Sequence, residues 1–178
     1  MRIVEDTRQQ KGKHERKHRW WEANGIEVVS RKLDFGDYVL DVESPSVSVD
    51  TKRDVAEVAA NISGQHERFK RECLRARDAG CLLVVLIENT DGFERVDDVA
   101  RWTNGVCLRC GRCDPHALGK CENPRHKSTR KPVQGARLAK AMQTMCERYG
   151  VEFVFCHPRD AAKIITEIVR RDAHGEHA

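Results

Sequence analysis

The sequence predicts an α/β protein in which helices flank a mixed central sheet. Short apolar runs bounded by turn residues come first along the chain, and helical patterns then alternate with further runs. The strongest run, residues 81–88, is apolar almost throughout, as expected of a strand buried on both faces. Of the 178 residues, 39% are hydrophobic and 34% charged, which is the balance of a soluble globular domain.

The first half of the chain carries strand and helix signals in turn. The predicted strands are 2–5, 26–33, 37–41 and 46–52, and the predicted helices are 11–23, 54–62 and 65–78. Asn24-Gly25 is a typical helix end, and Ser63-Gly64 separates the last two helices. The short connection 42–45, which contains Pro45, predicts a hairpin between the third and fourth strands.

The second half continues the alternation. Strands are predicted at 81–88 and 151–156, and helices at 96–102, 132–149 and 158–171. Gly150 marks the end of one helix, and Pro158 suits the first turn of the next.

Charge is distributed unevenly, although the formal net charge is only +4. Residues 1–20 hold seven Lys or Arg against three acids, and residues 107–137 hold eight against two. Between residues 34 and 57 the balance reverses, with seven acids against Lys52 and Arg53. Basic flanks around an acidic centre favour a polyanionic partner and a carboxylate site that could hold a metal, although solvated mixed-charge faces would explain the pattern equally well.

No apolar run approaches the about 18 residues that a membrane span needs, so we expect no membrane association. The first residues lack the basic-then-apolar plan of a secretion signal, so we expect a cytoplasmic protein.

Four of the eight cysteines form a cluster, Cys107-x2-Cys110-x2-Cys113-x7-Cys121. This spacing predicts a structural Zn²⁺ site, with an iron–sulfur cluster and unliganded thiols as alternatives. His116 or His126 could replace one thiolate. The other cysteines lie in apolar contexts and are expected to be buried free thiols: Cys73, Cys81, Cys146 and Cys156.

Residues 105–126, which carry the cluster, are predicted to be an insertion without helix or strand, because glycines and prolines punctuate them. The domain plan is therefore a core formed by 1–104 and 127–171, the Cys-rich insertion 105–126, and a flexible tail 172–178.

A second motif, residues 14–18, matches H-E-x-x-H. On a helix, His14 and His18 could bind zinc with Glu15 as the base of a peptidase. Basic residues surround the motif, so a solvated helix face lying near phosphates is the favoured interpretation.

The third constellation combines Asp37 with Asp50 and Lys52. Strand side chains alternate, so Asp50 and Lys52 share one face while Thr51 takes the other. The predicted hairpin brings Asp37 close to Asp50. Two carboxylates suit Mg²⁺, and a neighbouring lysine can orient or deprotonate a water, although a surface hairpin would also explain the pattern.

Three segments in this order resemble the motifs of the XPF family nuclease domain, in the manner of its small phage-encoded members. The segments are Ile3-Val4-Glu5-Asp6-Thr7-Arg8, Leu33-Asp34-Phe35-Gly36-Asp37-Tyr38 and Val49-Asp50-Thr51-Lys52. The resemblance covers nearly the whole chain outside the cysteine insertion. It implies a restriction-endonuclease-like fold and an endonuclease, dependent on Mg²⁺ or Mn²⁺, that cuts branched or flapped DNA in repair, recombination or phage DNA processing. A phage-encoded member would act in the bacterial host cytoplasm.

The resemblance also implies roles for single residues. Asp37 and Asp50 would hold the metal, Lys52 would assist the attacking water, Asp6 would add an acidic contact, and Arg8 would bind phosphate or brace the site. The sequence departs from the family at three places, with Gln9 for a glutamate, Asp50-Thr51 for Glu-Arg, and Ala56 for an aspartate. Since the family also contains inactive partners, a DNA-binding scaffold is the alternative function.

The substrate is expected to be positioned by basic residues, most of them in the cysteine insertion. The DNA-binding candidates are Arg68, Arg109, Arg112, Arg125 and Lys127. Because XPF relatives dimerise through this domain, we also expect a homodimer. Its surface could be the apolar faces of the last two helices, although these are more easily explained as core: Leu138, Met142, Met145, Ile164 and Ile168.

Overall fold

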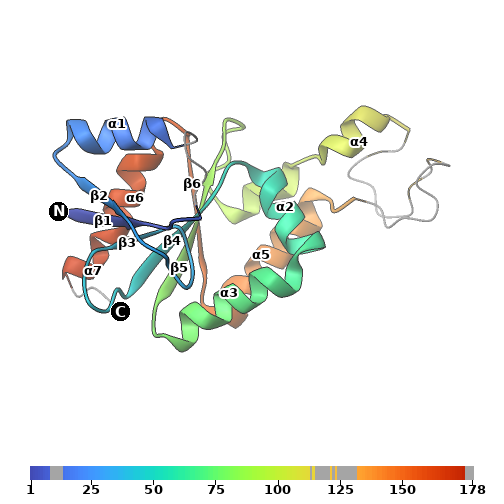
Figure 1. The fold of residues 1–178 in the computed structure, drawn as a ribbon. Coiled ribbons are helices and arrows are strands. Elements are labelled where there is room, and N and C mark those ends of the chain that lie inside the picture. The colour runs from blue at the N-terminus through green and yellow to red at the C-terminus, as the bar shows by residue number, and fades with distance from the viewer. Residues whose placement is uncertain (9–13, 113, 115–120, 122, 124–131, 175–178) are drawn as a thin grey trace.

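A six-stranded mixed sheet, with strand order β2-β1-β3-β4-β5-β6, forms the centre of the computed structural model (Figure 1). The structure describes residues 1–8, 14–112, 114, 121, 123 and 132–174. The strands are β1 (Arg2–Glu5), β2 (Glu27–Ser30), β3 (Tyr38–Leu40), β4 (Val47–Lys52), β5 (Leu82–Glu88) and β6 (Glu152–Cys156). β3 runs antiparallel to β1 and β4, and the other neighbouring pairs are parallel. The predicted mixed α/β sheet is confirmed, and every strand falls within a predicted one.

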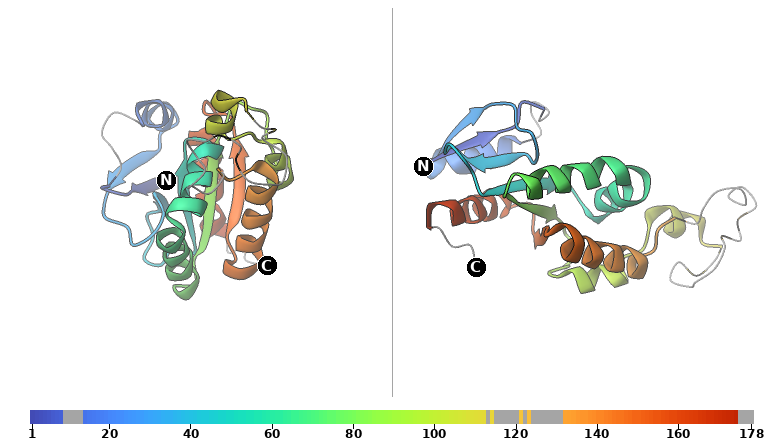
Figure 2. Two further views of the ribbon diagram at one scale, coloured as in Figure 1. Left: turned by 90° about the vertical axis from the view of Figure 1, so that its right-hand side faces the viewer. Right: turned by 90° about the horizontal axis from the view of Figure 1, so that it is seen from below.

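Helices cover both faces of the sheet, as Figures 1 and 2 show. Their bounds are α1 (Glu15–Ala23), α2 (Val55–Gly64), α3 (His66–Asp78), the 3-10 helix η1 (Val96–Arg101), α4 (Gly105–Cys110), α5 (Gly135–Tyr149), α6 (Ala161–Val169) and α7 (Arg171–His174). α2, α3, η1 and α5 pack on one face, and α1 and α6 pack on the other.

β5 separates two hydrophobic cores. Leu83, Val85 and Ile87 face the core under α2, α3 and α5, whereas Val84 and Leu86 face the core under α1 and α6. All five side chains are fully or almost fully buried, and each such burial stabilises the fold by about 1.5–3 kcal/mol. The prediction that residues 81–88 form a strand buried on both faces is therefore confirmed.

α4 corrects the expectation that residues 105–126 contain neither helix nor strand. Asn104 caps this helix, because its Oδ1 accepts a hydrogen bond from Val106 N at 3.0 Å. Gly111 ends the helix in the left-handed conformation, with φ of 59°. Six residues are too few to show a helical period, and the glycine at each end resembles loop punctuation. α4 lies beyond α2, at the opposite end of the molecule from α1 (Figure 1).

The apolar residues considered for a dimer surface are mostly core. Leu138, Met142 and Met145 of α5 and Ile168 of α6 are at most 3% exposed, and Ile164 packs against the core under α6. These residues pack inside one chain, so the homodimer stays a prediction without a surface from this set.

Part of the expected flexible tail is ordered. Residues 172–174 belong to α7, and Asp172 Oδ1 accepts a hydrogen bond from Ser46 N at 2.7 Å. Residues 175–178 lie outside the described residues. Within the described ranges, none of the helices has the length and apolar character that crossing a membrane requires.

Candidate active site

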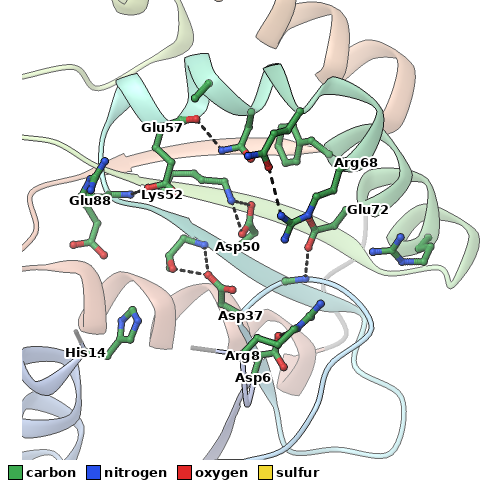
Figure 3. A pocket seen from close by; sticks show the side chains of 18 of the residues that line it. Asp6, Arg8, His14, Asp37, Asp50, Lys52, Glu57, Arg68, Glu72 and Glu88 are labelled. Carbon is green, nitrogen blue, oxygen red and sulfur yellow. Dashed lines mark hydrogen bonds and ion pairs between the residues drawn. The ribbon is translucent and has the colours of Figure 1, made fainter. Parts of the chain in front are cut away.

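A cleft of about 860 Å³ lies beside the ends of β3 and β4, below α3 (Figure 3). It is lined by six of the residues that the sequence analysis selected, namely Asp6, Arg8, Asp37, Asp50, Lys52 and Arg68. The structure therefore brings together the three motif segments, which are far apart in the sequence.

Gly36 lets the chain turn sharply into β3. Its φ is +67°, and a Cβ at this position would lie 2.1 Å from Ser48 Oγ, so only glycine fits. Immediately after the turn, Asp37 N donates to Val49 O at 2.7 Å, and Asp37 O accepts from Asp6 N at 2.8 Å. These backbone bonds fix Asp37 between the first and third motif segments.

The Asp37 carboxylate is held by Thr51. Its Oδ2 accepts hydrogen bonds from Thr51 N at 2.8 Å and from Thr51 Oγ1 at 2.6 Å. Burial raises the pKa of Asp37, because desolvation outweighs these hydrogen bonds and the charge of Lys52. Because water solvates this carboxylate poorly, a nearby cation would stabilise its charged form.

Asp50 and Lys52 form a buried ion pair on one face of β4, as strand alternation predicts. Lys52 Nζ lies 2.8 Å from Asp50 Oδ1 and 2.6 Å from Oδ2, and the two residues are 8% and 4% exposed. Burial raises the pKa of Asp50 to about 7, with Lys52 opposing the shift and Asp37 adding to it. Burial also acts to lower the pKa of Lys52, but the attraction of Asp50 outweighs it and the pKa is raised.

Asp6 braces the site. Its Oδ2 pairs with Arg8 Nε, and its Oδ1 accepts a hydrogen bond from Leu33 N at 3.2 Å. Arg8 Nη2 also donates to Leu33 O at 2.9 Å, so the pair ties β1 to the loop before Asp37. Both oxygens of Asp6 are engaged, and Arg8 therefore braces the site from its partly exposed position. Gln9 lies outside the described residues.

The acidic residues that flank Ala56 serve the start of α2. Asp54 Oδ1 accepts from Glu57 N at 2.7 Å, which is an N-cap. Glu57 lines the cleft, but its Oε2 accepts from Arg53 N at 3.0 Å. Ala56 itself is exposed.

Glu72 is a carboxylate of the cleft that the sequence analysis missed. It lies on α3, and its Oε1 accepts a hydrogen bond from Gly36 N at 3.1 Å. Its charge helps to raise the pKa of both Asp37 and Asp50. Helical periodicity could have indicated this position. Phe69 and Cys73 are buried, and residue 72 lies next to them on the surface of the same helix, so it lies close to the sheet.

Arginines form much of the cleft rim. Arg8, Arg53, Arg68 and Arg75 all line it and are all exposed or half-exposed. Arg75, which the sequence analysis did not select, donates only to the backbone oxygen of Asp34, at 3.2 and 3.3 Å. Arg68 donates to Gln65 Oε1 at 3.4 Å. Arg68 and Arg75 form no ion pair with any of the described residues, so both can offer charge to an anion.

The other two DNA-binding candidates that the structure describes do not line the cleft. Arg109 and Arg112 are exposed at α4 and just after it. Arg125 and Lys127 lie outside the described residues.

The two histidines of the H-E-x-x-H motif have different partners. His18 Nε2 lies 3.0 Å from Glu5 Oε1, whereas His14 Nδ1 lies 3.4 Å from Lys17 Nζ and the His14 ring lines the cleft. Glu15 is exposed and lies 3.9 Å from Arg19. This arrangement does not support a zinc peptidase.

The cysteine cluster is only partly described, because Cys113, His116 and His126 lie outside the described residues. Cys107 is buried at 7% exposure, and Cys110 and Cys121 are half-buried. Hydrogen bonds from the Arg112 backbone and the Asn123 side chain hold the pKa of Cys110 below its usual value. A lowered pKa favours the thiolate, which is the form that binds zinc.

The carboxylates of the cleft fit a hard divalent cation. Asp50 Oδ2 is buried and accepts no hydrogen bond, although it lies in the ion pair with Lys52. Among the described residues, no three His, Cys, Asp or Glu side chains already form a set that could hold a metal. Two carboxylates suffice for Mg²⁺, which keeps several of its waters.

Comparison with known proteins agrees with this fold and with the family that the motifs indicate. A model of the ERCC4 domain matches residues 5–168, whereas no curated protein matches the sequence. XPF from Aeropyrum pernix is 17% identical, with a TM-score of 0.57 over 97% of this chain. The same protein in complex with DNA is 16% identical, with a TM-score of 0.59 over 99%. The chain spans 65% and 67% of those two chains. The family model covers most of the sequence, and the protein belongs to the ERCC4 domain family.

Proposed function

We propose that this protein is a DNA endonuclease that requires Mg²⁺ or Mn²⁺ and prefers branched or flapped DNA. The observation that carries the proposal is the buried pair of Asp50 and Lys52 beside Asp37, inside a cleft with an arginine rim. Membership of the ERCC4 domain family supports it, as does the structural similarity to an XPF chain solved in complex with DNA.

Each residue has a chemical task in this proposal. Asp37 and Asp50 would hold the metal ion, which when bound would supply positive charge to the phosphate and make a water molecule more acidic. Lys52 is oriented by Asp50 and donates a hydrogen bond to the phosphate being attacked, where negative charge develops. Asp6 and Arg8 hold the loop that carries Asp37.

The reaction is hydrolysis of a phosphodiester. The water oxygen forms a bond to phosphorus as the bond between phosphorus and the O3′ atom breaks. The water supplies one proton to the departing oxygen, so the products are a 3′-hydroxyl and a 5′-phosphate.

Arginines of the rim would hold the DNA backbone on either side of the cut. Arg68 and Arg75 lie seven residues apart on α3, which is about two helical turns, so they project from the same side of the helix. Arg109, Arg112, Arg125 and Lys127 would extend the contact beyond the cleft. This second group is where selectivity for branched DNA would arise.

A structural Zn²⁺ would hold the cysteine segment. α4 places Cys107 and Cys110 one turn apart, and Cys113 and Cys121 would complete four thiolate ligands. A site closed in this way has no open position for water, so its role would be structural.

The test is a cleavage panel with the wild-type protein. Flap, fork, four-way and linear DNA of matched length are incubated with Mg²⁺, with Mn²⁺ or with chelator. The proposal expects cutting of the branched substrates, with either metal and not with chelator. Binding of DNA without cutting under every condition would instead support a catalytically inactive scaffold, and cutting that persists in chelator would exclude the metal-dependent reaction.

A further inference from the structure

Glu72 is a carboxylate of the cleft that forms no ion pair with any of the described residues. Six acidic side chains line the cleft, namely Asp6, Asp37, Asp50, Glu57, Glu72 and Glu88. The carboxylate of Glu72 points into the cleft from α3, across from Asp37 (Figure 3). Its Oε1 accepts a hydrogen bond from Gly36 N, and its Oε2 forms no hydrogen bond or ion pair with the described residues.

Two of these six acids are each paired with a cation of their own, and a third accepts a hydrogen bond from the backbone next to it. Asp6 is paired with Arg8, Glu57 accepts from the Arg53 backbone, and Glu88 lies 2.5 Å from the buried Lys17 ammonium. The acids left to face the cleft are Asp37, Asp50 and Glu72.

Those three carboxylates share a single buried ammonium, that of Lys52. When all of them are ionised, the group carries two negative charges in excess. Asp50 adds an independent observation, because it is only 4% exposed and its Oδ2, which lies 2.6 Å from Lys52 Nζ, accepts no hydrogen bond. Burying an excess of negative charge is costly, and a divalent cation would compensate it.

We propose that Glu72 is a further residue of the metal site, which accepts a hydrogen bond from the hydration shell of the ion held by Asp37 and Asp50. This inference rests on the proposed function. Contact through water follows from the geometry, because no three of the described acids, histidines and cysteines converge as direct ligands. It also follows from the chemistry of Mg²⁺, which gives up its waters reluctantly.

The role explains why α3 is tied to the loop before Asp37. The Gly36 N–H holds Glu72 Oε1 at 3.1 Å and leaves Oε2 for the cleft. Residues that support metal ligands in this way typically change metal affinity by about 10- to 100-fold when they are replaced.

Calorimetric titration of the purified protein with Mn²⁺, without DNA, tests the inference. Glu72→Gln keeps an acceptor for Gly36 N and removes the charge, so the Kd for Mn²⁺ should rise about 10- to 100-fold. Glu72→Asp keeps the charge on a shorter side chain, so its Kd for Mn²⁺ should lie between those of the wild type and Glu72→Gln. Glu67→Gln, on the exposed first turn of the same helix, is the matched control and should bind as the wild type does.

Thermal unfolding in chelator serves as the folding check, since all four proteins should unfold within a few degrees of one another. If Glu72→Gln binds Mn²⁺ as tightly as the wild type while Asp50→Asn does not bind, Glu72 has no role and the proposed function stands. If the wild type itself binds no Mn²⁺, the proposed metal-dependent function fails together with this inference. If Glu72→Gln unfolds far earlier in chelator and Glu72→Asp binds as the wild type does, the role of Glu72 is purely structural and the inference is wrong.

Discussion

Lys52 Nζ lies within 2.8 Å of both carboxylate oxygens of Asp50, two residues away on the same face of β4. The pair is buried under α3, where the Phe69 ring centroid lies 5.6 Å from Nζ. A pair so poorly hydrated stabilises a protein little in net terms, yet removing one partner is expensive. Its position in the cleft is therefore better explained by function than by stability.

Removing the Lys52 ammonium should destabilise the protein. We expect Lys52→Met to lower the free energy of unfolding by about 3–5 kcal/mol, because Asp50 is left buried without its counter-charge. Adding Asp50→Asn to Lys52→Met should recover much of the loss. Urea unfolding in chelator measures both, with Lys32→Met at an exposed position as the control. Equal stability of Lys52→Met and the control would show that the ion pair is not as desolvated as the structure has it.

Gly36 offers a test of backbone geometry at the site. In Gly36→Ala the new Cβ meets Ser48 Oγ at 2.1 Å as well as an unfavourable φ of +67°. Gly25→Ala is a matched control, because its φ is +65° and nothing lies within 4 Å of the new Cβ. The control should lose about 1–2 kcal/mol of stability from the backbone alone, and Gly36→Ala should lose more. Gly36→Ala should also slow DNA cleavage, because Asp37 follows directly.

Urea unfolding and a cleavage assay on the same two variants decide this point. Full cleavage by Gly36→Ala would mean that the position of Asp37 does not depend on this turn.

Arg68 and Arg75, the two arginines of α3 that line the cleft, should account for part of the salt dependence of DNA binding. On an Asp50→Asn background, in which cutting should be slow, Arg68→Gln and Arg75→Gln should each reduce the slope of log affinity against log salt by about 1. Arg77→Gln is the control, since Arg77 is paired with Asp78 and does not line the cleft. The measurement is fluorescence anisotropy at several salt concentrations.

The same assay compares the contribution of the cleft to DNA binding with that of the cysteine segment. A slope that changes with Arg109→Gln and Arg112→Gln, and not with the α3 pair, would move the DNA contact away from the cleft.

Metal analysis should find one zinc per chain that depends on the cysteine cluster. Cys110→Ser should lose the zinc, whereas Cys146→Ser, a half-buried thiol of α5, should keep it. Elemental mass spectrometry measures the content directly. Iron and sulfide in place of zinc would favour the iron–sulfur alternative, and a wild-type protein free of both metals would exclude a metal-held segment.

The sequence was most informative where patterns are local or where motifs fall in order. Strand alternation correctly placed Asp50 and Lys52 on one face of β4, and the hairpin prediction correctly brought Asp37 beside them. Thr51 was expected only to face away from Asp50, yet it holds the Asp37 carboxylate. That contact depends on where Asp37 lies relative to the end of β4, which alternation alone does not define.

The missed features depend on tertiary packing. Glu72 and Arg75 reach the cleft because of the rotation of α3 about its own axis as it packs against β5. The burial of Phe69 and Cys73 sets this rotation, and the sequence of this 13-residue helix alone does not. α4 was missed for a different reason, since it has only six residues, begins with Gly105 and is followed by Gly111. The capping roles of Asp54 and Glu57 could have been predicted, because an acid at the N-cap followed by a glutamate three residues later is a known helix start.

The most direct test of the central claim is single-turnover cleavage of a labelled flap DNA in Mg²⁺ by Asp50→Asn, compared with Asp54→Asn. Asp54 caps α2 and lies outside the cleft lining, and asparagine also caps helices well. We predict that Asp54→Asn cuts at close to the wild-type rate and that Asp50→Asn is slower by about 100-fold or more. Cleavage by Asp50→Asn at the wild-type rate would contradict the assignment of this cleft as the active site.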